Sequence, residues 1–148
     1  MAGSSSVSSS VSNLRKAQVS AAAAMHAQTV RLRVLSENVA HGDSTSPAPG
    51  VDPYRRKTVS FKNVFDRDLG MDLIVVDNVG RDKSELHKVH RPNDPGADEQ
   101  GFVKKTNVNT LIEMMDVREA TQSHDANLKV YQSANSMQTQ TIDALKGS

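Results

Sequence analysis

The sequence contains no cysteine and no tryptophan, and only 3% of its 148 residues are aromatic. The absence of cysteine excludes disulfides, thiolate metal sites and a cysteine nucleophile. Aromatic side chains bury the largest area per residue, so three Phe and two Tyr leave a thin core for this length. The chain is therefore poorly equipped to fold around one large hydrophobic core.

The charges are nearly balanced, with 18 Lys and Arg, 17 Asp and Glu, and a net charge of +1. This balance does not call for nucleic acid or an anionic membrane as a partner. No apolar run approaches the ~20 residues that a bilayer-spanning helix needs. The first residues, MAGSSSVSSSVSN, lack the basic and apolar regions of a Sec-type signal peptide. If the protein leaves the cytoplasm, we expect another route.

The residues that could support metal binding or catalysis do not form recognisable sites. His87 and His90 are three apart, which points them to opposite faces of a strand. The segment NDPGADEQG lacks the ligand spacing of a calcium loop and is typical of a turn with solvated carboxylates. No serine lies in a nucleophile-elbow motif, and there is no glycine-rich phosphate loop. We therefore expect no enzymatic activity, no cofactor, no bound metal and no small-molecule substrate.

Two clusters of charged residues are interpreted as structural features of the surface or of an assembly. The basic cluster YRRK (54–57) is predicted to be a solvated strand end, and contact with acidic neighbours in an assembly is a second possibility. Glu113 and Asp116 are one helical turn apart, which is typical of a solvated helix face.

The composition divides the chain into five segments. Residues 1–12 are rich in serine and are predicted to be a flexible N-terminus, with order on binding a partner left open. A helix is predicted over 13–41, capped by Asn13 and ended by Gly42. Its apolar residues recur every three or four positions, the 3.5-residue period of a coiled coil. A Pro- and Gly-rich loop follows over 42–53.

The middle segment, 54–106, is predicted to be a small β-rich module. RKTVSF, LIVV, ELHKVH and GFVKK have strand character, whereas DLGMD, DNVGRD and RPNDPGADEQG have turn chemistry. A second helix is predicted over 107–148, capped by Asn107 or Asn109 and reaching about Lys146. The predicted fold class is mainly α: long N- and C-terminal helices pair as a coiled coil, with a small β-rich insert between them.

The two predicted helices are too long to be covered by a module of about fifty residues, and polar residues interrupt their apolar stripes. Polar positions in such a stripe cost stability but fix register. We therefore expect an assembling subunit whose helices are covered by other copies or relatives. The predicted assembly interface is Leu14, Met25, Leu32, Leu35 and Val39 in the first helix, and Leu111, Met115, Leu128, Tyr131, Ile142 and Leu145 in the second.

One part of the sequence carries a family resemblance. VRLRVLSENVAHGDST (30–45) resembles the N-terminal signature of bacterial flagellar axial proteins, a helix that ends in Ser-x-Asn-apolar-Ala-Asn before a short loop. Ser36, Asn38, Val39 and Ala40 match this signature, and His41 stands where the family usually has Asn. DPGADEQGFVKKTNVN (94–109), which contains Asn107 and Asn109, and the following Glu113-Met114 resemble the short rod proteins of this family.

The resemblance implies a structural subunit of the proximal rod of the flagellar basal body. Such proteins polymerise helically into the drive shaft that crosses the periplasm and transmits motor torque. They are exported by the flagellar type III apparatus without a cleaved signal peptide. Implied partners are copies of the chain, other rod proteins, and MS-ring or export-gate adaptor proteins at the rod base. The alternative is a soluble coiled-coil adaptor or secretion chaperone that forms a small closed oligomer.

Overall fold

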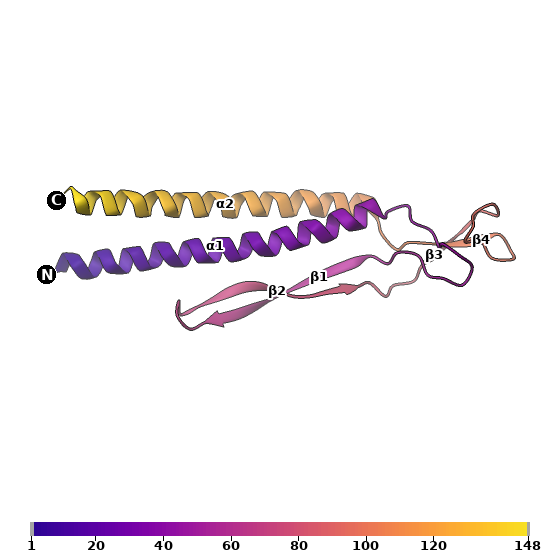
Figure 1. The fold of residues 1–148 in the computed structure, drawn as a ribbon, viewed down its shortest axis with the longest axis horizontal. Coiled ribbons are helices and arrows are strands. Elements are labelled where there is room, and N and C mark those ends of the chain that lie inside the picture. Colours follow the sequence, from indigo (N-terminus) through magenta and orange to yellow (C-terminus); the bar gives the residue numbers. More distant parts are fainter. Residues whose placement is uncertain (1, 148) are drawn as a thin grey trace. The chain divides into compact units, whose positions relative to one another are not determined.

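The computed structural model describes residues 2–147, so Met1 and Ser148, the outermost residues of the predicted terminal segments, lie outside it. In chain order the elements are α1 (Ala2–Ala40), β1 (Lys57–Asp66), β2 (Met71–Arg81), β3 (His87–His90), β4 (Phe102–Lys105) and α2 (Thr110–Lys146) (Figure 1). The prediction of two long helices with small β elements between them is confirmed. Neither described helix is long and apolar enough to cross a bilayer.

The chain divides into two compact units, and each contains parts of both helices. Unit 1 consists of Met1–Thr29, Phe61–Val75 and Thr121–Ser148, and unit 2 consists of Val30–Ser60 and Val76–Ala120. This differs from the predicted single β-rich module over 54–106, because the far end of β1 and the start of β2 belong with the helix ends of unit 1. The chain therefore has two small cores instead of one.

The N-terminal segment differs from the prediction of a flexible stretch over 1–12, because α1 begins at Ala2 instead of near Asn13. Its serines hydrogen-bond within the helix: the hydroxyl of Ser9 donates to the carbonyl of Ser6 (2.8 Å), and that of Ser6 to the carbonyl of Gly3 (3.0 Å). A serine hydroxyl can bond to a carbonyl of the preceding turn while the backbone stays helical. Composition alone does not reveal this.

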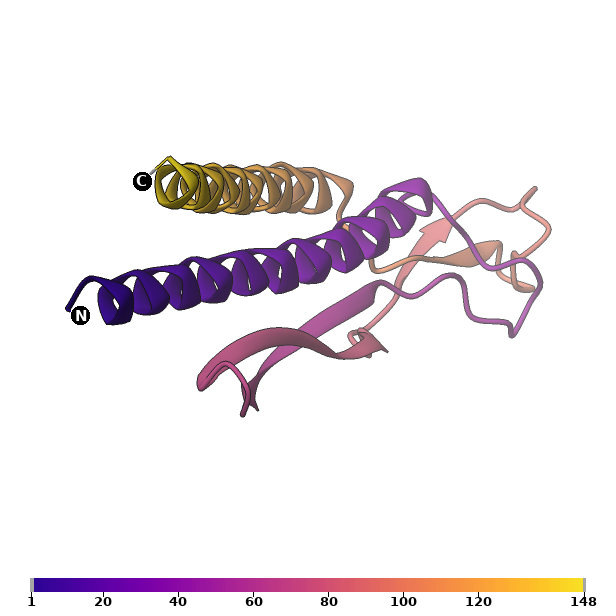
Figure 2. The ribbon, with the colours of Figure 1, turned by 60° about the vertical axis from the view of Figure 1, so that its left-hand side comes forward.

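Strands β1 and β2 pair as a two-stranded sheet, the pink ribbon in Figure 2. Gly70 closes the turn between them with a φ of 65°, and its N–H donates to the carbonyl of Asp66 (2.8 Å). The predicted turn DNVGRD is wrong, since β2 continues through it to Arg81. Beyond the strand, the N–H of Asp82 still donates to the carbonyl of Arg56 (2.8 Å), so pairing with the start of β1 outweighs the local turn chemistry.

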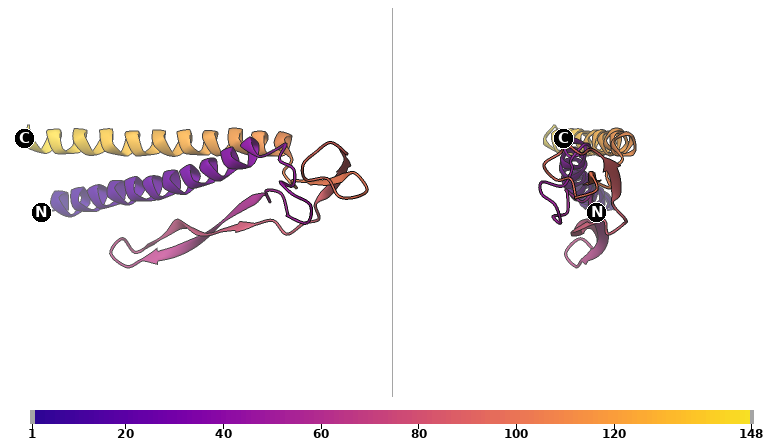
Figure 3. Two further views of the ribbon diagram at one scale, coloured as in Figure 1. Left: turned by 45° about the vertical axis from the view of Figure 1, so that its right-hand side comes forward. Right: turned by 90° about the vertical axis from the view of Figure 1, so that its right-hand side faces the viewer.

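Strands β3 and β4 form a second, antiparallel pair in unit 2 (Figure 3). In this pair Val89 lies opposite Val103. Turns and bends connect α1 to β1, and Thr45 in this connection bridges to Lys105 beside this pair. The 91–101 loop is held by Asp98, whose Oδ1 accepts the N–H groups of Gln100 (3.0 Å) and Phe102 (2.9 Å). The predicted turn there is confirmed, although Asp98 caps the backbone as well as being solvated.

The two units have different cores. In unit 2 the buried apolar residues include Val34, Leu35 and Val103. In unit 1 the fully buried apolar residues among those described are alanines: Ala21, Ala27 and Ala134. The helices of unit 1 are also joined by a hydrogen bond from Gln18 Nε2 to Gln138 Oε1 (2.9 Å). Alanine buries little apolar area, so the hydrophobic stabilisation of unit 1 is small.

We predict that the two units have different local stability in the isolated chain. Backbone amides near Ala21 and Ala134 should exchange with solvent at least about tenfold faster than amides near Val34 and Ala120, after correction for intrinsic rates. Hydrogen-exchange mass spectrometry of the monomer measures this directly. Equal protection across each helix would show that the alanine contacts are as stabilising as the core of unit 2.

Candidate functional site

The most distinctive feature of unit 2 is a buried amide at the end of α1. Asn38 is completely buried, and all four of its hydrogen-bonding positions are used. Its Nδ2 donates to the carbonyl of Lys57 and to Glu113 Oε2, both at 2.9 Å. Its Oδ1 accepts from the N–H of Lys57 (2.9 Å) and from the hydroxyl of Tyr54 (2.7 Å). Asn38 therefore pairs with β1 as a backbone group would, and also reaches α2.

Glu113 lies in the first turn of α2 and is 0% exposed. One oxygen of its carboxylate accepts from Asn38, and the other accepts from Nε of Arg56. The prediction that Glu113 lies on a solvated helix face is therefore wrong. Burying a carboxylate is costly unless it is paired and hydrogen-bonded, and here both conditions are met. The sequence feature that relates to this pairing is the basic cluster at 54–57. Its position in the chain does not indicate that its acidic partner, Glu113, lies more than fifty residues away.

Asn107 extends this network on the other side of Arg56. Its Oδ1 accepts the N–H of Arg56 (2.7 Å), and its Nδ2 donates to the carbonyl of Asp82 (3.2 Å) and the hydroxyl of Ser84 (3.1 Å). The helix cap is Asn109 instead, whose Oδ1 accepts the N–H of Ile112 (3.3 Å). Asn107 thus joins the start of β1 to the end of β2, just before α2 begins.

The rim of this cluster carries partly exposed groups. The ring of His41, at the position where the resemblance expects Asn, stacks on that of Tyr54 with centroids 4.1 Å apart and planes at 10°. Burial raises the pKa of Tyr54, with a further contribution from the charge of Glu37. Lys57 hydrogen-bonds to Glu37, and this bond holds the pKa of Glu37 below its usual range. The basic cluster 54–57 therefore binds acidic and polar groups of its own chain.

The arrangement fixes the geometry of the segments that it joins. Both oxygens of Glu113 and all positions of Asn38 are occupied by partners within the chain. Among the described residues, no three or more His, Asp or Glu side chains are grouped so that they could hold a metal ion. We refer to Asn38, Tyr54, Arg56, Lys57, Asn107 and Glu113 as the polar cluster. It joins the last turn of α1, the start of β1 and the first turns of α2.

The structure brings together three residues of the family signature: Asn38, Asn107 and Glu113. The other signature residues have separate places, since Ser36, Ala40 and Met114 are exposed and Val39 is half-buried. Arg56, Tyr54 and Lys57 were missed as cluster members, because a sequence does not show which distant polar groups meet. The polar cluster thus explains part of the signature, and the exposed members lie outside it.

The predicted interface residues fall into two groups. In α1, Leu35 is buried at 5% exposure, and Leu14, Met25, Leu32 and Val39 are half-buried. In α2 all six are exposed, from Leu111 at 70% and Met115 at 64% to Leu128, Tyr131, Ile142 and Leu145. The fully buried residues of α2 are instead Glu113, Ala120 and Ala134. Within each unit, the large apolar residues of α2 are therefore not the ones that the chain buries.

We predict that Asn38→Asp is among the most damaging single substitutions in the chain. A carboxylate there would face Glu113 and could not donate to the carbonyl of Lys57. We expect a loss of about 3–5 kcal/mol in the free energy of unfolding, as for a broken buried charge pair. Urea unfolding followed by circular dichroism measures it. Asn63→Asp, the same change at an exposed strand position, should cost less than about 0.5 kcal/mol. Similar losses for both variants would contradict the assignment.

A second prediction concerns the pH dependence of the rim. Glu37 titrates below its ordinary pKa of 4.5 because Lys57 hydrogen-bonds to its charged form. A lowered pKa means that this contribution to stability is present above pH 4.5 and is lost as the pH falls through the lower, folded value. Lys57→Met should move the pKa of Glu37 upward in a carboxyl NMR titration, whereas Lys88→Met, at an exposed site, should not. An unchanged Glu37 titration in Lys57→Met would contradict the pairing.

Comparison with known proteins gives the family. The family model described as the C-terminal part of flagellar basal-body rod FlgEFG proteins matches residues 99–144. A flagellar basal-body rod protein FlgC from Agrobacterium fabrum is 44% identical over 86% of this chain and 92% of its own length. FlgC proteins of Bacillus subtilis (33% identical, over 82% and 91%) and Borreliella burgdorferi (30%, over 86% and 94%) are also similar. The chain therefore belongs to the family of flagellar basal-body rod proteins FlgC.

Proposed function

We propose that this chain is a structural subunit of the proximal rod of the bacterial flagellum, and that copies of it and other rod proteins build the drive shaft. The observation that carries the proposal, beside the family, is the uncovered apolar surface at the start of α2. Leu111, Met114 and Met115 are more than half exposed. Their i, i+3, i+4 spacing puts them on one side of the helix, away from the buried Glu113 and Ala120.

Such a surface requires a partner. Single exposed apolar residues are ordinary, but a cluster of large ones on one helix face marks an interaction site. Further along α2, Leu128, Tyr131, Ile142 and Leu145 are also exposed, which supports interfaces along much of the helix. The finer proposal is that these residues, with Leu14, Met25, Leu32, Leu35 and Val39 of α1, form the coiled-coil contacts of the assembled rod. In that assembly the alanine core of unit 1 would gain the coverage that the single chain lacks.

The remaining parts of the proposal follow from the family and the sequence. We propose that the chain reaches the periplasm through the flagellar type III apparatus without a cleaved signal peptide. At the rod base it would contact adaptor proteins of the MS ring or export gate, and along the rod it would transmit torque. In the polar cluster both carboxylate oxygens of Glu113 are occupied, which supports a purely structural role without enzymatic activity.

The proposal predicts that Met115→Asp blocks assembly without unfolding the chain. A charge at this exposed position should change the free energy of unfolding of the monomer by less than about 0.5 kcal/mol. At an interface it removes a buried methionine, so we expect at least a tenfold weaker association, at about 1.4 kcal/mol per tenfold. Motility and rod assembly in a strain whose own gene copy is deleted provide the measurement. Leu35 is a poorer choice, because its burial means that a charge there would also disturb the fold.

The matched control is Gln122→Asp, which adds the same charge at an exposed polar position of α2 and should swim normally. Normal motility of Met115→Asp would count against this surface.

The alternative, a closed coiled-coil adaptor, differs in the free protein: it should form a discrete oligomer with protected helix ends. A rod subunit should remain a monomer with cleavable ends. Analytical ultracentrifugation and limited proteolysis distinguish the two.

A further inference from the structure

The end of the β1–β2 hairpin exposes an aromatic side chain. Phe65, one of three Phe in the sequence, is 61% exposed. Outside α2, no other large apolar residue that the structure describes is more than half exposed. Val64, the preceding residue, is 44% exposed, and successive residues of a strand point to opposite faces. Both faces of β1 are therefore uncovered near its end.

Hydrogen bonds fix the backbone of the turn that follows. The Oδ1 of Asp66 accepts the N–H groups of Asp68 (2.9 Å) and Leu69 (3.0 Å). The carboxylate of Asp68 is exposed, and no hydrogen bond or ion pair engages it among the described residues. We refer to residues 65–70 as the hairpin tip. It presents an aromatic ring and an unpaired carboxylate on a fixed backbone, and a fixed backbone lowers the entropy cost of binding.

The first turns of α2 carry complementary groups. The exposed face of Leu111, Met114 and Met115 is continued by Arg118, which follows the two methionines at i+4 and i+3. Arg118 is exposed, and no hydrogen bond or ion pair engages its guanidinium within the part of the chain that the structure describes. A large apolar surface therefore lies beside an unpaired cation.

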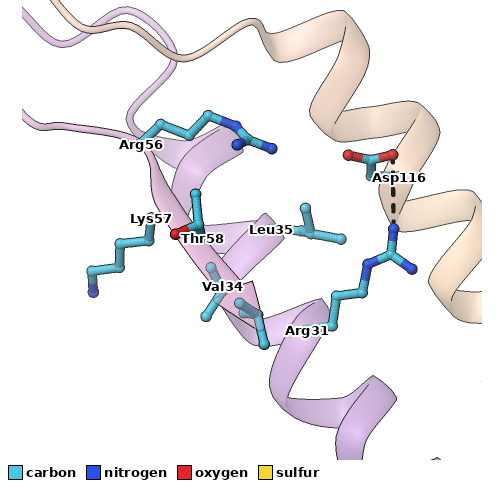
Figure 4. Close-up of a pocket in the computed structure, with 8 residues that line it drawn as sticks. Arg31, Val34, Leu35, Arg56, Lys57, Thr58 and Asp116 are labelled. Atoms are coloured by element: carbon cyan, nitrogen blue, oxygen red, sulfur yellow. Dashed lines mark ion pairs between the residues drawn. The ribbon is translucent and has the colours of Figure 1, made fainter. Parts of the chain in front are cut away.

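The acids of the same turns already face cations of unit 2. Asp116 and Glu119 lie 3.9 Å and 3.8 Å from the guanidinium of Arg31, and Figure 4 shows the first of these ion pairs. Glu113 is buried in the polar cluster. Arg118 is thus the charged side chain of these turns that the described residues leave without a partner.

The hairpin tip and the start of α2 match in chemistry. Methionine is flexible and polarisable, so it adapts its shape to an aromatic ring and contacts the ring favourably. Aromatic residues and methionine are also enriched in protein interfaces. A guanidinium beside the methionines can pair with a carboxylate beside the ring, through charge-assisted hydrogen bonds.

We propose that the hairpin tip of one copy binds the start of α2 in a second copy. Phe65 packs on Leu111, Met114 and Met115, and Asp68 pairs with Arg118. The inference rests on the proposed function, since a rod subunit is surrounded by copies of itself and relatives. The two surfaces differ, so the contact is head-to-tail, which repeats from copy to copy and suits a ring or helical assembly.

The aromatic ring distinguishes Asp68 from other exposed acids as the partner of Arg118. Glu85 and Glu99 are also exposed, but neither has an apolar residue more than half exposed within three positions. Either of them could supply only the charge, whereas the hairpin tip supplies the charge and the apolar group together. An ion pair at the rim contributes mainly to orientation, and the buried aromatic contributes most of the affinity.

Phe65→Ala tests the apolar part in a motile strain whose own gene copy is deleted. The ring is exposed in the single chain, so its removal should leave the thermal unfolding midpoint of the purified monomer unchanged. In cells we expect at least a tenfold loss of intact basal bodies. Val79→Ala, which truncates an exposed apolar residue near the other end of the hairpin, should assemble normally. Normal assembly of Phe65→Ala, or an equal loss in Val79→Ala, would overturn the proposal.

A charge swap tests the pairing of Asp68 with Arg118. Asp68→Arg and Arg118→Asp should each reduce the number of intact basal bodies, and the double variant, which restores opposite charges, should recover most of that loss. The control combines Arg118→Asp with Glu85→Arg and should recover nothing. No recovery in the first combination, or equal recovery in both, would overturn the pairing.

A cross-linking test keeps Phe65 in place, so it does not depend on how Phe65→Ala folds. The sequence has no cysteine, so introduced thiols are the only ones in the chain. Cells that co-express Asp68→Cys and an epitope-tagged Arg118→Cys should yield, on mild oxidation, disulfide-linked pairs of one tagged and one untagged chain. Glu85→Cys with the same tagged variant should not. Absence of the first pair, or equal yields of both, would overturn the proposal.

These results separate the contact from the function on which it rests. If Phe65→Ala assembles normally while Met115→Asp does not, the contact is wrong and the rod function stands. If both assemble normally, the proposed function itself fails. If Phe65→Ala blocks assembly but Asp68→Cys and Arg118→Cys do not cross-link, the hairpin tip binds a different protein, and the assignment to a second copy is overturned.

Discussion

The amide of Asn38 is the constraint on which the structure of unit 2 depends. It is buried, and each of its two donors and two acceptor positions has a partner. These partners belong to the start of β1 and to α2, so one side chain holds three segments that are far apart in the sequence. A buried polar group must be satisfied or it destabilises the fold. Few other arrangements of these segments would satisfy Asn38, and this gives the cluster its specificity.

This kind of specificity suits a chain with little hydrophobic core. Apolar contacts tolerate sliding and rotation, because one apolar group can replace another of similar volume as a partner. A hydrogen-bonded amide and a paired carboxylate are not tolerant, since a small shift leaves a charge or donor unsatisfied. Burying Glu113 against Asn38 and Arg56 is thus less a source of net stability than a means of fixing one arrangement. The alanine core of unit 1 has no comparable buried network among the described residues.

The sequence predicts the elements of this fold better than it predicts how they meet. Helical period and propensity predict α2 and the part of α1 from Asn13 onward, and strand-like composition predicts the positions of all four strands, because these signals are local. Apart from the serine-rich start of α1, the errors lie where a distant partner outweighs local preference. DNVGRD has turn chemistry, yet pairing with the start of β1 keeps it extended to Arg81. Glu113 has the spacing of a solvated residue, yet Arg56 and Asn38 make its burial possible.

The large apolar residues of α2 also show that a sequence pattern does not identify the partner of a side chain. Their spacing predicted an interface, but spacing does not show whether the residues that cover it belong to the same chain or to another. The structure buries small and polar residues, Glu113, Ala120 and Ala134, and leaves Leu111 and Met115 exposed. A helix that used its largest apolar residues within the chain would have little left for neighbours. Small contacts within the chain and large ones on its surface are the division expected of a subunit that gains most of its stability by assembling.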